Sequence, residues 1–335
     1  MSIPQRPEPK HTPLATVTAL RGLAAGWVMI FHLTNGQATI PNTTALRSMG
    51  SWGWLGVEVF FVLSGFVMGL SLDRAKYRPR HQFGSFMRRR LLRLTPPYLV
   101  TIALTLLLWF ASTLVPQYRG TGPDLSVLQV FLNITYMAGI FNQPWINPVF
   151  WTLALELQFY LLLAGVFPLL TGRRRWLTVL AVVACISCPL VFSDERLVTY
   201  WLSLFGSGLL IWLLKSQRLR MAQAVVLITL AAIVTFVTHG LMVGLVVVSV
   251  TGVLALKDMR PIRWINYLGL ISYSVYLLHI PIGGRVMNLM GRLPSSPWTD
   301  LLALAAATVC SLVAAAALYR WVEKPSKALA SQYGS

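Results

Sequence analysis

Residues 20–33 read "LRGLAAGWVMIFHL", an almost wholly apolar stretch that carries two ionisable side chains, Arg21 and His32. With its flanking residues it reaches the about 20 mainly apolar residues that a membrane helix needs. The two side chains are eleven residues apart, so on a helix they share one face and lie about 16 Å apart along the axis. Ionisable groups inside a bilayer are costly and usually face a cavity or a partner. The stretch therefore predicts a membrane helix with one functional face.

The composition of the whole chain also favours a membrane protein. Of its 335 residues, 56% are hydrophobic and only 11% are charged, which is more apolar surface than a soluble domain can bury. Ten apolar segments are candidates for spans, and we expect an all-α, polytopic bundle of about ten transmembrane helices. The segments lie near 14–34, 54–72, 97–115, 149–171, 176–192, 197–214, 222–238, 240–256, 264–287 and 301–321.

Positive charge supports this layout and gives it an orientation. The formal net charge is +18, from 28 Lys and Arg against 10 Asp and Glu. If the N-terminus is cytoplasmic, 22 of the basic residues fall in cytoplasmic segments and five outside, and Arg21 lies within the first span. Cytoplasmic loops of membrane proteins carry such an excess. We therefore expect both termini in the cytoplasm and no nucleic-acid partner.

The sequence divides into one long membrane domain and two short ends. Residues 1–13 are polar and proline-rich and are expected to form a disordered cytoplasmic N-terminus. Residues 14–323 hold the spans, and residues 324–335 form a cytoplasmic C-terminal tail. The sequence Cys185-x-x-Cys188 lies in an apolar run without a second pair, so we expect packing and no metal site.

Four titratable groups are expected in the outer half of four different spans: His32, Glu58, Glu156 and His279. A histidine beside a carboxylate is held in the tautomer that accepts a proton, so Glu156 or Glu58 is expected to orient His32. Depth alone does not place these groups in contact. A membrane histidine can also simply bridge helices through a hydrogen bond, and Arg21 could extend to the inner interface.

The basic run "RRRLLRLTPPY" at residues 88–98 is a second candidate site. Arg90 and Arg93 are spaced i, i+3 and face one way on a helix. Such a pair can hold a phosphate group, although the run also suits a simple anchor of membrane topology. Pro96-Pro97 is expected to end this helix and begin the third span.

The order of several short motifs resembles the bacterial integral-membrane acyltransferase-3 family over nearly the whole chain. Each motif is weak alone, but their succession is specific. The matches are Arg21-x10-His32, "GVEVFFVLSGF" with Glu58, Arg90-x-x-Arg93, "WTLALE" ending at Glu156, "SYSVYLLH" ending at His279, and Glu323-Lys324-Pro325.

The resemblance implies an O-acyltransferase of the bacterial inner membrane. Such an enzyme moves an acyl group, most often acetyl, from cytoplasmic acyl-CoA to a hydroxyl of an extracytoplasmic glycan, such as an exopolysaccharide or a lipid-linked saccharide. The co-substrate is acyl-CoA, and no metal is implied. The implied roles are general base for His32, catalytic support for Glu156 and Glu58, acyl-CoA binding for Arg21, Arg90 and Arg93, and a supporting position for His279.

Two other functions stay open at this stage. A macrolide or another small secreted molecule could be the acceptor. A proton-coupled transporter could use intramembrane Arg, His and Glu as a relay. The sequence does not reveal the acceptor, the acyl length, an acyl-enzyme intermediate, the oligomeric state or partner proteins.

Overall fold

A computed structural model describes residues 14–36, 45–115, 124–256, 258–260, 262–294 and 296–333. The segment 1–13, expected to be disordered, lies outside the described residues. The described part contains helices and turns and no strand, which confirms the all-α prediction. Eight helical segments in it are long and apolar enough to cross a membrane. Their helices are α1 (Ala15–Asn35), α3 (Gly56–Arg74), α4 (Pro79–Thr113), α6 (Phe150–Thr171), α8 (Val198–Lys215), α9 (Met221–His239), α11 (Arg263–Leu278) and α13 (Pro297–Leu318).

The remaining elements are short. Two of them, α7 and α10, are apolar and correspond to the other two predicted spans. The 15 residues of α10 reach about 22 Å, less than the about 30 Å hydrocarbon core. The short elements are α2 (Ala45–Gly50), η1 (Gly53–Leu55), α5 (Val127–Ile134), α7 (Arg175–Ser187), η2 (Cys188–Leu190), α10 (Leu241–Ala255), η3 (His279–Gly283), α12 (Gly284–Met290), η4 (Tyr319–Glu323) and α14 (Lys324–Ser331).

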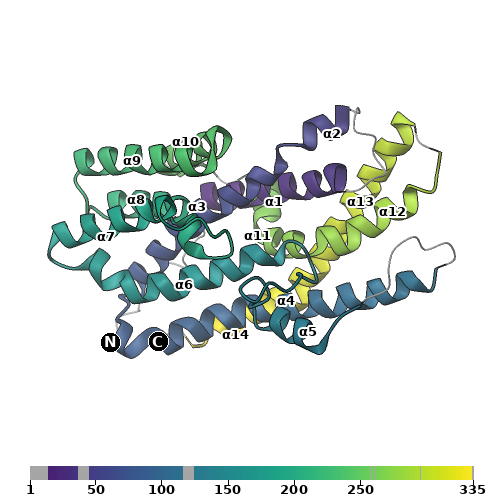
Figure 1. Ribbon diagram of the computed structural model, residues 1–335, viewed down its shortest axis with the longest axis horizontal. Helices are drawn as coiled ribbons and strands as arrows, with labels where there is room; N and C mark the ends of the chain where they lie inside the picture. The colour runs from purple at the N-terminus through teal and green to yellow at the C-terminus, as the bar shows by residue number, and fades with distance from the viewer. Residues whose placement is uncertain are drawn as a thin grey trace, which may run out of the picture.

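The helices form one bundle whose centre is built from α1, α3, α8 and α11 (Figure 1). In this view α9 and α10 lie at one edge, and α4 runs along the opposite edge. Helix α3 packs closely on α8, and α1 packs closely on α11. Helix α8 is buried along most of its length, so its apolar sequence serves the protein core and not lipid contact.

Glycines make the contact between α3 and α8 possible. Gly65-x-x-x-Gly69 has the spacing typical of closely packed membrane helices. A Cβ on Gly65 would lie 1.9 Å from a carbonyl oxygen of α8, and a Cβ on Gly208 would lie 1.9 Å from a carbonyl oxygen of α3. A Cβ on Gly69 would lie 2.6 Å from the Trp212 ring. The two backbones therefore touch directly.

Replacing Gly65 by alanine should destabilise the bundle. The added methyl group meets backbone that cannot rotate away, so α3 and α8 must separate, at a cost of about 1–3 kcal/mol or more. We expect a lower Tm of the detergent-solubilised variant in thermal unfolding followed by size-exclusion chromatography. Gly165→Ala in α6 is the control, because no atom lies within 4 Å of its added Cβ. Equal Tm values for the two variants would contradict the direct backbone contact.

Helix α4 runs without a break through Pro96 and Pro97, so the prediction that this pair ends the helix is wrong. Proline's fixed φ fits a helix, and its main penalty is the loss of backbone donors. Within membranes, neighbouring side chains can satisfy the affected backbone. The carbonyls that lose their amide donors are those of Leu92 and Arg93, and next to them the Tyr273 hydroxyl donates to the Leu94 carbonyl at 2.8 Å. The arginine-bearing turn and the apolar part of α4 are consequently one continuous rod.

The segment after residue 123 folds back on the bundle, beginning with α5. Asn133 is buried and its side chain donates to the Pro144 carbonyl at 3.1 Å and accepts from the Ile146 amide at 2.9 Å. On the other side of α5, Val127 and Phe131 are exposed. An exposed apolar face next to polar anchors is typical of helices at a membrane interface.

Candidate active site

Two adjoining cavities lie among the central helices. The small cavity has a volume of about 50 Å³ and is lined by Arg21, Ser64 and Glu156, among others. The large cavity has a volume of about 550 Å³ and is lined by His32 and Glu58 together with many aromatic side chains. Val57 and Tyr276 line both. The residues that the sequence singled out on α1 thus line two adjoining cavities.

His32 and His279 form a hydrogen-bonded pair between α1 and η3. The Nε2 atom of His279 lies 3.3 Å from Nδ1 of His32. The Nδ1 atom of each ring also lies 3.0 Å from a backbone carbonyl of its own helix, Val28 for His32 and Val275 for His279. A carbonyl oxygen only accepts, so we assign a proton to both Nδ1 atoms. His32 then donates to His279, and its own Nε2 keeps a free lone pair.

The backbone around His279 is unusual. The segment His279–Gly283 is π-helical, and single π-helical turns are frequent at functional sites. A Cβ on Gly283 would lie 2.7 Å from the side chain of Leu33, so this glycine lets the turn approach α1 just beyond His32. The turn thus brings the two imidazoles into contact.

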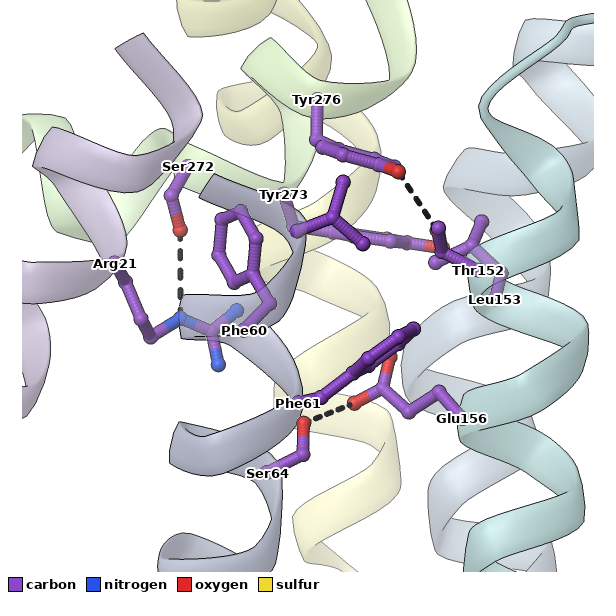
Figure 2. Close-up of a pocket in the computed structure, with 11 residues that line it drawn as sticks. Arg21, Phe60, Phe61, Ser64, Thr152, Leu153, Glu156, Ser272, Tyr273 and Tyr276 are labelled. Atoms are coloured by element: carbon purple, nitrogen blue, oxygen red, sulfur yellow. Dashed lines mark hydrogen bonds between the residues drawn. The ribbon is translucent and has the colours of Figure 1, made fainter. Parts of the chain in front are cut away.

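Glu156 and Arg21 reach toward the small cavity from different helices, as Figure 2 shows. Glu156 Oε1 accepts a hydrogen bond from Ser64 Oγ at 3.2 Å and another from the Tyr160 hydroxyl. Arg21 Nε donates to Ser272 Oγ at 3.4 Å. The carboxylate is therefore anchored by hydroxyl groups, and within the described residues no hydrogen bond holds the Nη groups of the Arg21 guanidinium.

The contacts of His32 differ from the expected histidine–carboxylate pair. Among the described residues its hydrogen-bonding partners are Val28 and His279, and neither Glu156 nor Glu58 bonds to it. Glu58 lines the large cavity with His32, is 4% exposed, and has no hydrogen-bond partner for Oε2 within the described residues. His279, which was expected only to support the site, is thus the side chain that contacts His32 directly.

The three arginines expected to bind acyl-CoA lie near one another beside the N-terminal half of α1. Arg90 Nη2 donates to Ser71 Oγ at 2.8 Å, and its guanidinium lies 5.4 Å from the centre of the Tyr160 ring. Arg93 is close enough to interact electrostatically with both Arg21 and Arg90. The pair spaced i, i+3 on α4 therefore meets the arginine of α1.

Sequence reasoning missed a fourth cation in this group. Lys327 of α14 forms an ion pair with buried Glu323 at 2.5 Å and also interacts electrostatically with Arg93 and Arg21. Ser274 Oγ donates to Glu323 at 2.5 Å. The motif Glu323-Lys324-Pro325 marked Glu323, but the spacing of Lys327 by four residues on the same helix face was the signal for its partner.

A polar network holds two loops together at the rim of the large cavity. Arg196 donates to Asp194 from Nε and Nη2, at 2.8 and 2.7 Å, and also to Asn142. The hydrogen bonds from Arg196 lower the pKa of the Asp194 carboxyl to about 2, so the pair stays charged. Gln158 Nε2 donates to the Arg196 carbonyl at 3.0 Å. Gln158 and Arg196 both line the cavity.

In the part of the chain that the structure describes, no three His, Cys, Asp or Glu side chains are placed to hold a metal ion. Two cysteines of the Cys185-x-x-Cys188 sequence are free thiols.

The fold and the site define a multi-pass membrane protein with buried cations, carboxylates and a histidine pair around two adjoining cavities. A family model described as an acyltransferase domain matches residues 14–320. The chain therefore belongs to the acyltransferase-3 family, and its class is that of membrane O-acyltransferases.

Three relatives illustrate the similarity. BcsY of Komagataeibacter xylinus, whose name describes a membrane-bound transacylase, is 29% identical over 79% of this chain and 72% of its own length. The acyltransferase MdmB of Streptomyces mycarofaciens is 33% identical over 56% of this chain and 48% of its own length. The O-acetyltransferase OatA of Staphylococcus aureus is 32% identical over 56% of this chain and 31% of its own length. No solved structure matches the chain.

Proposed function

We propose that this protein is an inner-membrane O-acyltransferase that moves an acyl group, acetyl in the simplest case, from acyl-CoA to a hydroxyl of an extracytoplasmic glycan. The observation that carries the proposal is the His32–His279 pair. It leaves Nε2 of His32 as a proton acceptor beside a large cavity, and that cavity adjoins the space in front of the arginine cluster. The similarity to the O-acetyltransferase OatA supports acetyl as the group transferred.

The proposed chemistry needs a base and a protonated leaving group. His32 Nε2 takes the proton of the acceptor hydroxyl while the oxygen attacks the thioester carbonyl. A C–O bond forms, the C–S bond breaks, and the proton on His32 returns to the CoA thiolate. A general base of this kind is worth about 10²–10⁴-fold in rate. His279 holds the ring of His32 in the reactive tautomer.

The donor is proposed to enter from the arginine side. With the N-terminus in the cytoplasm, as the charge distribution predicts, Arg21, Arg90 and Arg93 face the compartment that contains acyl-CoA. Guanidinium groups suit its phosphates. The thioester then has to pass the residues common to both cavities, where the Tyr276 hydroxyl lies 2.7 Å from Thr152 Oγ1. Glu156 is proposed to keep this inner space polar through Ser64 and Tyr160.

The proposal is tested with acetyl-CoA that carries a label on its acetyl group. Membranes that contain the protein should incorporate the label into a glycan fraction, and a deletion strain should lack the corresponding acyl group in glycan mass spectrometry. Membranes without the protein are the control. If the label appears instead on a small secreted molecule, that molecule and not a glycan is the acceptor. Unaltered glycans together with no labelled product would refute acyl transfer and would favour the alternative function, a proton-coupled transporter.

A further inference from the structure

Residues 272–274 of α11 hold three other elements of the bundle by hydrogen bonds. The first, a serine, accepts from Arg21 Nε of α1 at 3.4 Å. The second, a tyrosine, donates to the Leu94 carbonyl of α4 at 2.8 Å. The third, a serine, donates to Glu323 of η4 at 2.5 Å. Since Arg93 precedes Leu94 in the sequence, one turn of α11 gathers Arg21, Arg93 and Glu323.

Helix α14, which follows η4, lies along the arginine-bearing turn of α4 (Figure 1). The Arg88 guanidinium lies 3.8 Å from the centre of the Tyr333 ring, so the residues just after α14 meet the beginning of α4, and the two helices run in opposite directions. Both rise by about 1.5 Å per residue. Moving along α4 from Arg88 to Arg93 therefore corresponds to moving back from Tyr333 to the turn that contains Lys327.

Lys327 reaches this meeting point from α14. Its Nζ atom lies 2.5 Å from Oε1 of Glu323 and 5.3 Å from the centre of the Tyr319 ring. Glu323 is fully buried, whereas the side chain of Lys327 is 32% exposed. An ammonium group has three N–H donors, and the Glu323 carboxylate does not need them all. Lys327 is thus held in place and can still bind a second anion.

The cluster holds more positive than negative charge. Four cations interact electrostatically there with two carboxylates, and the members are Arg21, Arg90, Arg93, Lys327, Glu156 and Glu323. Arg89 adds a further positive charge next to Arg90. Within the described residues, no hydrogen bond or ion pair holds the guanidinium of Arg93 or the Nη groups of Arg21. Because like charges repel one another strongly away from water, the cluster suits an anion with more than one negative charge.

A diphosphate has the required charge, and it is the first anionic group reached along a CoA molecule from the thioester. Resting on the function proposed above, we propose that Lys327 contacts the diphosphate of acyl-CoA together with Arg21 and Arg93. The C-terminal helix α14 then forms one wall of the donor site. Glu323 positions the ammonium group, and the site selects thioesters that carry the diphosphate over pantetheine thioesters that lack it.

The test uses donors that lose their phosphate groups in steps. The probes are acetyl-CoA, acetyl-3′-dephospho-CoA, which keeps the diphosphate, and acetyl-pantetheine, which has no phosphate. Initial rates of the full-length protein in nanodiscs give a KM for each donor, and calorimetric titration measures CoA binding without any acceptor. Lys327→Met removes the charge and keeps an apolar side chain. It should raise the KM for the two diphosphate donors about tenfold or more and leave that for acetyl-pantetheine within about twofold.

Three further variants separate donor contact from damage to the fold. Lys327→Arg should restore most of the donor affinity, because a guanidinium also binds phosphate. Lys324→Met is the matched control, since Lys324 is exposed on the same helix, and its donor KM should not change. Glu323→Gln with Lys327→Met removes both charges and leaves no buried carboxylate unpaired. This double variant should keep the raised KM for the diphosphate donors.

The results distinguish this inference from the function on which it rests. A loss of equal size for all three donors would show a purely structural role for Lys327 and overturn the inference. A loss confined to acetyl-CoA would place Lys327 at the ribose phosphate and overturn the diphosphate assignment. Acetyl transfer with an unchanged donor KM in Lys327→Met would also overturn it. CoA binding that depends on Lys327, without any acetyl transfer, would refute the acyltransferase proposal and leave the diphosphate site standing.

Discussion

His32→Ala should lower the rate of acyl transfer by about 10²–10⁴-fold, the usual contribution of a general base. The variant loses the imidazole ring that lines the large cavity, while the backbone of α1 and its packing on α11 should stay in place. The effect should fall on kcat and not on the KM for acyl-CoA, because the arginine cluster is untouched. The measurement is initial-rate kinetics with labelled acetyl-CoA at equal amounts of protein in the membrane.

The control for this experiment is His81→Ala. His81 is exposed on α4 and lies outside both cavity linings. The His81→Ala variant should transfer acyl groups at the rate of the unmodified protein. His32→Ala combined with His279→Ala should be no slower than His32→Ala alone, since His279 acts through the first ring. Substantial transfer by His32→Ala would remove this residue as the base.

Arg90→Ala with Arg93→Ala should raise the KM for acyl-CoA by about 100-fold or more. Two charge-assisted hydrogen bonds to phosphate are worth about 1.5–3 kcal/mol each, and every 1.4 kcal/mol is tenfold in affinity. The kcat at saturating donor should stay close to that of the unmodified protein, because neither side chain lines the cavity with His32. Titration of acetyl-CoA at fixed acceptor measures both constants.

A second pair of arginines separates donor binding from topology. Arg173 and Arg174 are exposed and lie between α6 and α7. Arg173→Ala with Arg174→Ala removes the same amount of basic charge from a segment expected to be cytoplasmic. The donor KM of this control should not change. If the Arg90 and Arg93 variant also keeps its donor KM, the pair serves only as an anchor of membrane topology.

Most of the fold could be predicted because membrane helices depend on one simple property, the length of apolar sequence. Each of the ten predicted segments contains a helix. The prediction failed where tertiary contacts override a local rule. Proline pairs often end helices in water, but α4 continues through Pro96 and Pro97 and packs against α6, α11 and α14.

The sequence could predict how deep in the membrane the site residues lie, but not which helices lie next to one another. The sequence placed His32 and His279 in the outer half of their spans, and these depths are consistent with the contact between the rings. It could not state which helices are neighbours. A Cβ on Gly22 would lie 2.7 Å from the Gly269 amide, so α1 and α11 adjoin, and this neighbourhood pairs two imidazoles. Glu156 belongs to α6 and turns to Ser64 and Tyr160 instead.

The partition formed by Val57 and Tyr276 bears on how the cell keeps its ion gradients. A bilayer that stores energy as a voltage cannot contain a permanently open water path, since each charge that crosses 100 mV dissipates about 2.3 kcal/mol. The hydrogen bond between Tyr276 and Thr152 lies at this boundary, since Tyr276 lines both cavities and Thr152 lines the small one. If this boundary opens only when the pantetheine chain of acyl-CoA enters it, the donor itself fills the opening. An acyl group can then cross the membrane without a leak of protons.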